Sequence, residues 1–378
     1  MAFEHYIRSG QKQLRCGYTT GTCAALAAAG AARMLLTGQV PERLRLVTPK
    51  GLAVEVEPRD CALENDTARC AVVKDGGDDA DVTTGHLVVA AVTKTASGVA
   101  IDGGAGVGRV TKPGLDQPVG AAAINRVPRQ MIAAAVEEVC GETGYGGGLS
   151  IVISVPDGEE LARRTFNPML GIEGGISILG TSGIVEPMSE QAIVDTIAVE
   201  QHQAAVSGAR DLLLTPGNYG MDFLQTLGLD TRGVPCVKYS NFVGDALDIA
   251  ASEGFESVLL VGHIGKLVKL AGGVMNTHSK WADCRMEMFC AHAAVCGGDT
   301  DLCRRLMEAA TTDACIAALD EAGLREAVLN SLLAAIQTHL ECRAAGNFLV
   351  GAVTFSNEYG LLGKTETVEE ILRRWRQD

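Results

Sequence analysis

The chain has 378 residues, 47% of them hydrophobic, and is too long for one ordinary core, so two domains are expected. A net charge of −14 and an aromatic content of 4% argue against nucleic-acid binding, which uses a basic face and stacking rings. The longest run of small apolar residues, 23–36, contains Arg33 and is too short to cross a bilayer, and residues 1–13 lack an apolar signal core. A cytoplasmic protein that binds neither membrane nor nucleic acid is therefore expected.

The twelve cysteines are scattered, and no Cys-x-x-Cys pair occurs. His292 and Cys296 are four residues apart and would share a helix face. Two candidate ligands without a third more often belong to a core than to a metal site. The sequence therefore predicts a reduced, cytosolic protein without a structural metal.

Residues 1–165 alternate short strands with two helices, which predicts an α+β domain with mostly antiparallel strands. A helix is expected from Thr20 to Leu36, and a hairpin is expected around Pro49-Lys50-Gly51. The hairpin strands are 44–48 and 52–57, and the other elements are a helix at 122–140 and strands at 68–74, 86–95, 99–102 and 149–155.

Residues 166–378 repeat a different pattern, in which a short apolar strand is followed by a glycine-bearing turn and a helix. The expected strands are 176–179, 212–215, 236–239, 258–261 and 348–353. This repetition predicts a parallel sheet in a Rossmann-like α/β domain. A mostly helical insertion, about 282–343, precedes the last strand, and the domain boundary is placed near Thr165.

The glycine cluster at 103–108 is similar in composition to a dinucleotide-binding loop. It leads into an extended segment rather than a helix, so the spacing and the setting both argue against that function. A flexible hairpin or bulge is the better interpretation. Arg109 and Lys112 follow this glycine segment and remain candidates to line a ligand site.

Three hydroxyls and a glycine, Thr19-Thr20-Gly21-Thr22, open the first helix. Threonine is a good N-cap, but one hydroxyl is enough for capping. Free N–H groups and the helix dipole also make such a turn suited to a carboxylate or a phosphate. Capping and anion binding are supported equally.

An acidic turn, Lys74 to Asp81, carries four carboxylates within seven residues. Such a turn is usually solvated surface, and this interpretation is somewhat favoured. A calcium loop lacks its helix–loop–helix setting and its terminal Glu. Magnesium binding and positioning of a substrate are the functional alternatives.

Polar or glycine-bearing turns follow four of the strands expected in the second half. They are 180–183, 215–220, 240–245 and 262–266, and Asn276, Thr277 and His278 crowd further polar groups after the last of them. The carboxyl ends of parallel strands meet at one edge of a sheet, where α/β proteins bind ligands. The sequence therefore predicts a small-molecule site lined by all four turns.

With these segments in view, the chain closely resembles the cobalt-precorrin-5B carbon-1 methyltransferases of anaerobic cobalamin biosynthesis. The resemblance rests on GYTTGTCAA (17–25), KDGGDDADVTTG (74–85), GVGRVTKPGL (106–115), AINRVPRQMI (123–132), GISILGTSGIVEPMS (175–189), TPGNYG (215–220), KYSNFVGDAL (238–247) and GHIGKLVKLAGGVMNTHS (262–279). One small departure is Gly76, where alanine is expected.

The resemblance implies S-adenosylmethionine as methyl donor, cobalt-precorrin-5B as substrate, and cobalt-precorrin-6A and S-adenosylhomocysteine as products; cobalt enters only with the substrate. The donor is expected mainly on the second domain, and the macrocycle is expected in the cleft between the domains, where the first domain binds it. The expected donor-binding residues are Gly180, Thr181, Ser182, Gly183, Glu186, Gly217, Asn218, Ser240, Asn241, Asp245 and Gly262. The expected substrate-binding residues are Thr19, Thr20, Thr22, Lys74, Asp75, Arg109, Lys112, Arg126 and Lys266.

His263 directly follows a strand and is the best-placed candidate for proton handling, although a histidine that only hydrogen-bonds its own turn is at least as well supported. Two rival functions remain at this point. A phosphate- or nucleotide-handling enzyme would bind magnesium at 75–81, and a tetrapyrrole carrier would bind the macrocycle without a methyl donor. Assembly into a homo-oligomer is left open by the sequence.

Overall fold

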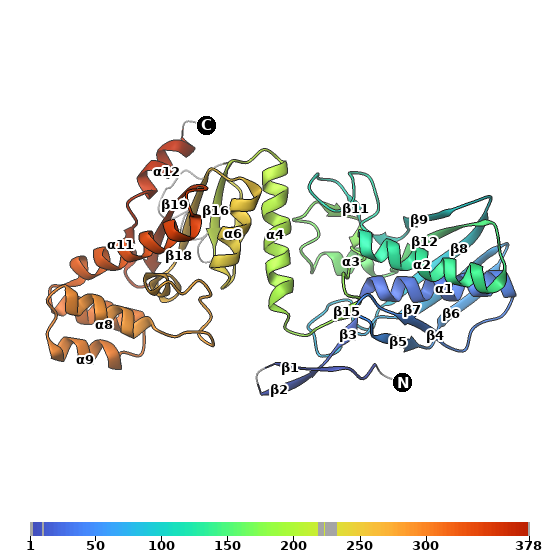
Figure 1. The fold of residues 1–378 in the computed structure, drawn as a ribbon, viewed down its shortest axis with the longest axis horizontal. Coiled ribbons are helices and arrows are strands. Elements are labelled where there is room, and N and C mark those ends of the chain that lie inside the picture. The colour runs from blue at the N-terminus through green and yellow to red at the C-terminus, as the bar shows by residue number, and fades with distance from the viewer. Residues whose placement is uncertain (1–2, 10, 218–222, 224–232, 377–378) are drawn as a thin grey trace. The chain divides into compact units, whose positions relative to one another are not determined.

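The computed structural model describes residues 3–9, 11–217, 223 and 233–376. The chain forms two compact units, residues 1–189 and 190–378, each with its own hydrophobic core (Figure 1). The division comes after Ser189 rather than near Thr165. Two short strands between these positions, β13 (Ile172–Glu173) and β14 (Gly175–Ile176), pair with strands of the first unit.

The first unit is built on a five-stranded sheet with the order β6-β7-β8-β12-β9. Its strands are β6 (Arg59–Glu64), β7 (Thr67–Val73), β8 (Leu87–Thr95), β9 (Val99–Gly103) and β12 (Gly148–Ser154). Neighbouring strands are antiparallel, as expected, except β12 and β9, which are parallel. The sequence did not indicate β6, an edge strand whose side chains are half-buried or exposed.

Two helices, α1 (Thr20–Thr37) and α2 (Arg126–Thr143), lie together over one face of this sheet (Figure 1). Alternate strand residues such as Val88, Ala90 and Val92 turn toward them. The many alanines of α1 allow this close approach, and Gly38 ends the helix with φ 74°.

Smaller strand pairs complete the first unit. The expected hairpin forms from β4 (Leu44–Val47) and β5 (Ala53–Val56). The other pairs are β1 (Tyr6–Ser9) with β2 (Lys12–Arg15), β3 (Gly17–Tyr18) with β15 (Ile184–Val185), β10 (Gly106–Val107) with β14, and β11 (Arg109–Val110) with β13. A short helix, α3 (Gly158–Ala162), follows β12.

The glycine cluster at 103–108 forms a closely packed strand crossing. A Cβ atom on Gly106 would lie 1.8 Å from the Val155 carbonyl oxygen, and one on Gly108 would lie 2.4 Å from Ile172 Cγ2. Glycine is needed here because neighbouring backbone approaches so closely. The structure therefore agrees with the exclusion of a dinucleotide loop, but the segment is a closely packed strand crossing rather than a flexible hairpin or bulge.

We expect Gly106→Ala to destabilise the first unit markedly more than Gly98→Ala. Both glycines have positive φ, 72° and 76°, so both variants carry the backbone strain, about 1–2 kcal/mol. Only Gly106 also meets backbone atoms, whereas nothing lies within 4 Å of a Cβ on Gly98. Urea unfolding followed by circular dichroism should show a difference of at least about 1 kcal/mol, and equal losses would contradict the packed crossing.

The second unit contains a five-stranded sheet with the order β17-β16-β18-β19-β20. Its strands are β16 (Asp211–Thr215), β17 (Cys236–Lys238), β18 (Ser257–His263), β19 (Leu349–Ser356) and β20 (Gly360–Lys364). The first four are parallel, as expected, and β20 is antiparallel to β19. The expected strand at 176–179 belongs to the other unit.

Helices cover both faces of this sheet (Figure 1). Leu212, Leu214 and Leu260 pack on the side of α4 (Glu190–Val206), α6 (Val243–Glu253) and α11 (Arg325–Ala344), whereas Leu213 and Leu259 pack on the side of α12 (Val368–Trp375). The expected helical insertion follows β18. It consists of α8 (Arg285–Val295), α9 (Thr300–Glu308), α10 (Thr312–Glu321) and α11, and it is preceded by two short helices, α7 (Ile264–Leu267) and the 3-10 helix η1 (Val268–Gly272).

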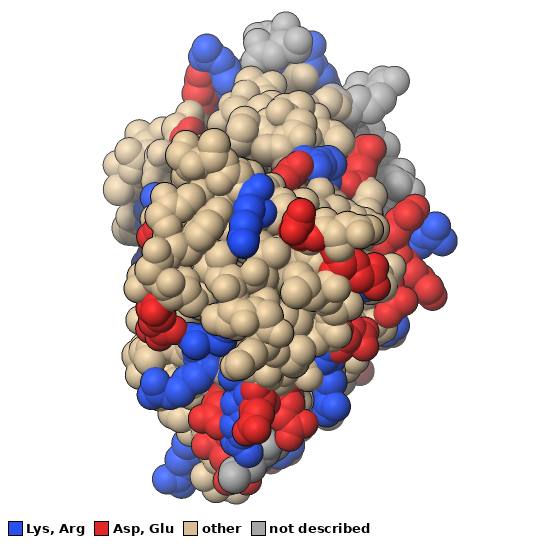
Figure 2. All heavy atoms as spheres, turned by 90° about the vertical axis from the view of Figure 1, so that its right-hand side faces the viewer, with Lys and Arg blue, Asp and Glu red and all other residues tan. Residues whose placement is uncertain are grey.

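The surface carries no broad basic face on the side that Figure 2 shows. This is the end of the first unit, where a wide uncharged area is bordered by acidic and basic side chains together. Among the residues described above, no helix is both long and apolar enough to cross a bilayer.

Candidate functional site

The candidate site is the carboxyl edge of the parallel sheet in the second unit. The chain runs from β16 outward to β17 and then returns to β18 on the other side of β16. The strand order therefore reverses between β16 and β18, and α/β sheets bind ligands at such a switch point. Gly217, Ser240 and His263 all lie just beyond or at the ends of these strands.

The turn after β17 is held in an unusual conformation. Ser240 has φ 55°, a region that non-glycine residues seldom adopt. Asn241 is fixed from outside the turn, because its carbonyl oxygen accepts the Thr277 N–H at 2.9 Å and its Oδ1 accepts the Thr277 hydroxyl at 3.3 Å. The loop that contains Thr277 thus lies beside this turn. The polar segment 276–278 noted in the sequence therefore lies at the carboxyl edge of the sheet.

Two lysines of the 264–272 segment stabilise these loops. Lys266 Nζ donates to the Ser240 carbonyl oxygen at 3.0 Å, and burial lowers the pKa of this lysine. Lys269 is 2% exposed and donates to the carbonyl oxygens of Thr277 and Ala282 at 3.0 and 2.8 Å. Lys266 was expected to bind substrate, but its ammonium is engaged by the protein. No motif in the sequence indicated the role of Lys269.

His263 ends β18 and turns back on its own loop. Its Nδ1 accepts the Gly265 N–H at 3.0 Å, and its ring lies edge-on to Phe355. Burial lowers the pKa of His263, and the charge of Asp313 acts in the opposite direction. Because Nδ1 is an acceptor, the neutral ring carries its proton on Nε2. This geometry suits a hydrogen-bond donor better than a general base.

The remaining predicted residues of this edge differ in accessibility. Asp245 lies in the first turn of α6 and is exposed, and Gly217 is half-buried with open space around its Cα. Gly262 is buried, and a Cβ there would touch Leu267 at 3.2 Å, so it allows close packing rather than ligand contact. Asn218 lies outside the described residues.

The turn at 180–183 does not join this edge. Thr22 Oγ1 donates to the Gly183 carbonyl oxygen at 2.7 Å, and a Cβ on Gly180 would collide with Thr19 at 2.3 Å. The prediction that four turns line one sheet edge is therefore wrong for this turn, which packs on the start of α1 in the first unit. Thr181 and Ser182 belong to the same turn. The short pairing of β15 with β3 places it there.

The same contacts occupy the three threonines at the start of α1. Thr19 caps the helix by accepting the Thr22 N–H at 3.2 Å, and Thr20 Oγ1 accepts the Leu179 N–H at 2.9 Å. The Gly21 N–H donates to the Leu179 carbonyl oxygen at 2.9 Å. All three threonine side chains are buried. Capping and packing therefore use these groups, and an anion site here is not supported.

Glu186, expected to face the positive sulfur of the donor, instead forms an ion pair with Lys50 in the first unit. Both side chains are 36% exposed. The β4–β5 hairpin and the segment after β15 supply the two partners. Within the first unit, the carboxylate of Glu186 is thus paired with a cation.

The acidic turn at 74–81 is ordered by internal contacts. Lys74 is 2% exposed and its Nζ lies 2.7 Å from Asp81 Oδ2, while Asp75 forms a two-pronged ion pair with Arg15 at 2.7 and 2.8 Å. The hydrogen bonds from Arg15 hold the pKa of Asp75 below its usual range. Asp78 Oδ2 accepts the Arg15 N–H at 2.7 Å. These contacts give Lys74 and Asp75 a structural role, which argues against their binding the substrate.

The predicted cations of 109–126 are more accessible. Arg109 is tied to Asp102 at 2.7 and 3.0 Å, which leaves little freedom for a ligand. Lys112 is exposed and donates weakly to the Met169 carbonyl oxygen at 3.4 Å. Arg126 is exposed at the start of α2.

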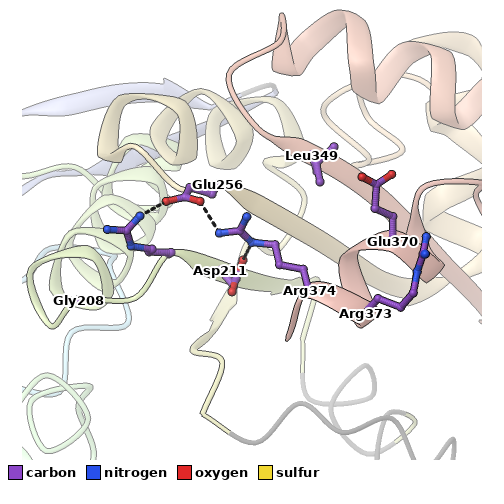
Figure 3. Close-up of a pocket in the computed structure, with 8 residues that line it drawn as sticks. Gly208, Asp211, Glu256, Leu349, Glu370, Arg373 and Arg374 are labelled. Atoms are coloured by element: carbon purple, nitrogen blue, oxygen red, sulfur yellow. Dashed lines mark hydrogen bonds and ion pairs between the residues drawn. The ribbon is translucent and has the colours of Figure 1, made fainter. Parts of the chain in front are cut away.

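A cavity of about 870 Å³ lies at the opposite edge of the second unit's sheet (Figure 3). Asp211 begins β16 there, and Glu256 directly precedes β18. Arg374 Nε donates to Asp211 Oδ1 at 3.0 Å, and the same guanidinium pairs with Glu256, which also pairs with Arg210. This closed network fastens α12 to the amino ends of the strands. We interpret it as structural.

No group of three or more His, Cys, Asp or Glu side chains with a metal-binding arrangement occurs in the part of the chain that the structure describes. Cys23 is fully buried, and burial raises the pKa of its thiol to about 12. This thiol therefore remains protonated at neutral pH.

Comparisons with known proteins agree over almost the whole chain. The family model described as CbiD matches residues 7–187, and the model described as CbiD, C-terminal domain, matches residues 276–366. A protein of Ruminiclostridium cellulolyticum named cobalt-precorrin-5B C(1)-methyltransferase is 48% identical, with 94% of this chain and 92% of the relative covered. A protein of the same name from Alkaliphilus metalliredigens is 42% identical over 98% and 97%.

Among solved structures, a cobalamin biosynthesis protein (cbiD) from Archaeoglobus fulgidus is 30% identical, with a TM-score of 0.40 over 74% of this chain and 87% of that chain. The coverage of 94% and 98% of this chain by the two curated relatives extends into both units. This chain belongs to the CbiD family.

Proposed function

We propose that this protein transfers the methyl group of S-adenosylmethionine to carbon 1 of cobalt-precorrin-5B. The observation that carries the proposal is the 48% identity, over 94% of the chain, to a relative named for this reaction. The carboxyl edge of a parallel sheet in the second unit supplies a fitting place for the donor. The direct test is to incubate the full chain with methyl-labelled donor and cobalt-precorrin-5B and to follow the label into the corrinoid by mass spectrometry.

The donor has an adenosine, an amino-acid end and a sulfonium, and the residues of this edge fit such a ligand. Asp245 offers an exposed carboxylate for hydroxyl or ammonium groups. Asn241 Oδ1 accepts the Thr277 hydroxyl, so Nδ2 is the group of this amide that we propose donates to the ligand. His263 can donate from Nε2. They are proposed in place of Gly180 and Glu186, which belong to the first unit.

When bound, the donor supplies an electrophilic methyl group, and the enzyme's main task is alignment. Orientation of two reactants can contribute roughly 7–11 kcal/mol in favourable cases. The conjugated macrocycle is itself the nucleophile, so a strong protein base is not required. We further propose that the second unit is Rossmann-like and binds the donor, and that the first unit binds the macrocycle. The four parallel strands with a reversal at β16 and β18 support the first of these assignments.

Substitution at the carboxyl edge should weaken donor binding, whereas substitution at the amino edge should not. We expect Asn241→Ala to raise the Kd for S-adenosylhomocysteine about tenfold, since it removes a donor and exposes the Thr277 hydroxyl. Arg373→Ala, which alters the cavity of Figure 3, is the matched control. Isothermal titration calorimetry on the full chain provides both values. A larger increase in Kd for Arg373→Ala than for Asn241→Ala would contradict the proposal and would indicate that the donor binds at the amino edge of the sheet.

A further inference from the structure

Two loops of the first unit, 111–120 and 163–171, lie side by side at one end of β11. The pairing of β11 with both Ala122 and β13 brings them together. Thr111 then ties the loops through its backbone N–H and its hydroxyl, which donate to the Gly171 carbonyl oxygen at 2.7 and 2.9 Å. We call these two loops the cationic lobe.

Three apolar side chains of the cationic lobe are exposed. Val119 is 58%, Phe166 55% and Met169 60% exposed. Their exposure follows from the way the second loop is fixed: Asn167 is 7% exposed, its Nδ2 donates to the Gly175 carbonyl oxygen at 3.1 Å, and its Oδ1 accepts from a neighbouring serine. With Asn167 held inward, the side chain before it is presented to solvent. Three large exposed apolar side chains on two adjoining loops make these loops a candidate interaction site.

The cationic lobe also carries an excess of positive charge in a chain whose net charge is −14. Lys112, Arg163 and Arg164 are exposed, and Asp116 is the one carboxylate of the two loops. Asp116 accepts a hydrogen bond from the backbone of Arg126. Within the described ranges, neither Arg163 nor Arg164 is in an ion pair, in contrast to Arg109. These cations are therefore available to an anionic ligand.

We propose that the cationic lobe receives the tetrapyrrole substrate, with the apolar side chains against the ring and the arginines near its carboxylate arms. The inference rests on the proposed function, which supplies the ligand class. A tetrapyrrole of this kind combines an apolar, flat ring with a rim of carboxylates. The lobe combines apolar groups and unpaired cations in the same way. It takes over the role first assigned to Thr19, Lys74 and Asp75.

The experiment uses two cobalt corrins as probes for the full-length protein. Cobyrinic acid has free carboxylate arms, and cobinamide has amide arms on the same ring. We expect Phe166→Ser to raise the Kd for both probes about tenfold or more, because it removes apolar contact. We expect Arg164→Glu to raise the Kd about tenfold for cobyrinic acid and to leave cobinamide nearly unchanged, because it replaces attraction by repulsion. Visible absorbance of the corrin reports binding.

Val40→Ser and Arg45→Glu are the matched controls, since both residues are exposed in the first unit and belong to other segments, the stretch after α1 and strand β4. They should leave both affinities unchanged. Unaltered thermal unfolding should accompany every variant, because all the changed side chains are exposed. The proposal that the cationic lobe binds the substrate would be overturned if wild type and lobe variants bound the corrins with equal affinity. It would also be overturned if the wild type bound neither corrin. Failure of the proposed function shows separately, as an absence of S-adenosylhomocysteine binding.

Discussion

We expect Lys74→Met to destabilise the first unit by about 3–5 kcal/mol, because it leaves a largely buried carboxylate without its partner. Lys74 is 2% exposed, and its Nζ lies 2.7 Å from Asp81 Oδ2. Burial by itself raises the pKa of Asp81, but the Lys74 charge and the hydrogen bonds from Lys74 and Thr83 outweigh it and hold the pKa below the usual range. Urea unfolding monitored by circular dichroism measures the loss.

The pH dependence follows from the same pKa. The pKa of Asp81 is lower in the folded state than in the unfolded state, where it is about 4. The ionised carboxylate therefore stabilises the fold fully above the unfolded-state pKa, and this stabilisation is lost as the pH falls through the folded-state pKa. The difference in the free energy of unfolding between wild type and Lys74→Met should therefore become smaller below about pH 4. Lys50→Met is the control, because the Lys50–Glu186 pair is 36% exposed on both sides and should be worth about 1 kcal/mol or less. Equal losses in the two variants would argue against a buried pair.

The second large effect concerns Trp375 on α12. We expect Trp375→Ala to destabilise the second unit by about 3–5 kcal/mol, since it removes a large side chain that is 8% exposed and packs with Leu213 and Leu259. It also removes the hydrogen bond from Trp375 Nε1 to Ser257 Oγ at 2.7 Å. Ser257 in turn donates to Asp211 at 2.6 Å.

Trp375→Phe separates these two contributions. It keeps most of the packing and removes only the N–H donor, so we expect a loss of about 1 kcal/mol. The chain has two tryptophans, so far-UV circular dichroism is preferable to fluorescence for comparing the variants. A loss in Trp375→Phe as large as that in Trp375→Ala would show that the hydrogen-bond network, rather than packing, holds α12.

Elements with strong local signals were predictable from the sequence. Thr19 and Gly38 mark the two ends of α1, and Pro49-Lys50-Gly51 marks the hairpin. The buried strands β16, β18 and β19 are short apolar runs, and their parallel pairing follows from the intervening helices. The helical insertion was likewise evident.

Long-range pairing decided what the sequence could not. The strand expected at 176–179 had the right composition for the parallel sheet, but Gly175 and Ile176 pair with Gly106 and Val107 in the other unit. Two-residue strands have no periodicity to indicate their partners. The turn at 180–183 was misplaced for the same reason.

Partners of polar side chains were also hidden from a sequence-based argument. Lys74 looked like a surface cation in an acidic turn, but Asp81 accompanies it into the interior. The hydroxyls of Thr20 and Thr22 looked available for a ligand, but distant backbone groups occupy them. At the second unit's edge, by contrast, Ser240, Asn241 and His263 lie at strand ends as predicted.

The position of α12 also bears on how the protein emerges from the ribosome. Residues 1–189 form a compact unit with its own hydrophobic core, so we expect it to fold while the remainder is still being translated. The sheet of the second unit is different, because the helix that shields Leu213 and Leu259 is encoded after all five of its strands. That face of the sheet stays uncovered until residues 368–375 have been synthesised. We therefore expect chaperones to bind nascent chains that are stalled before this point.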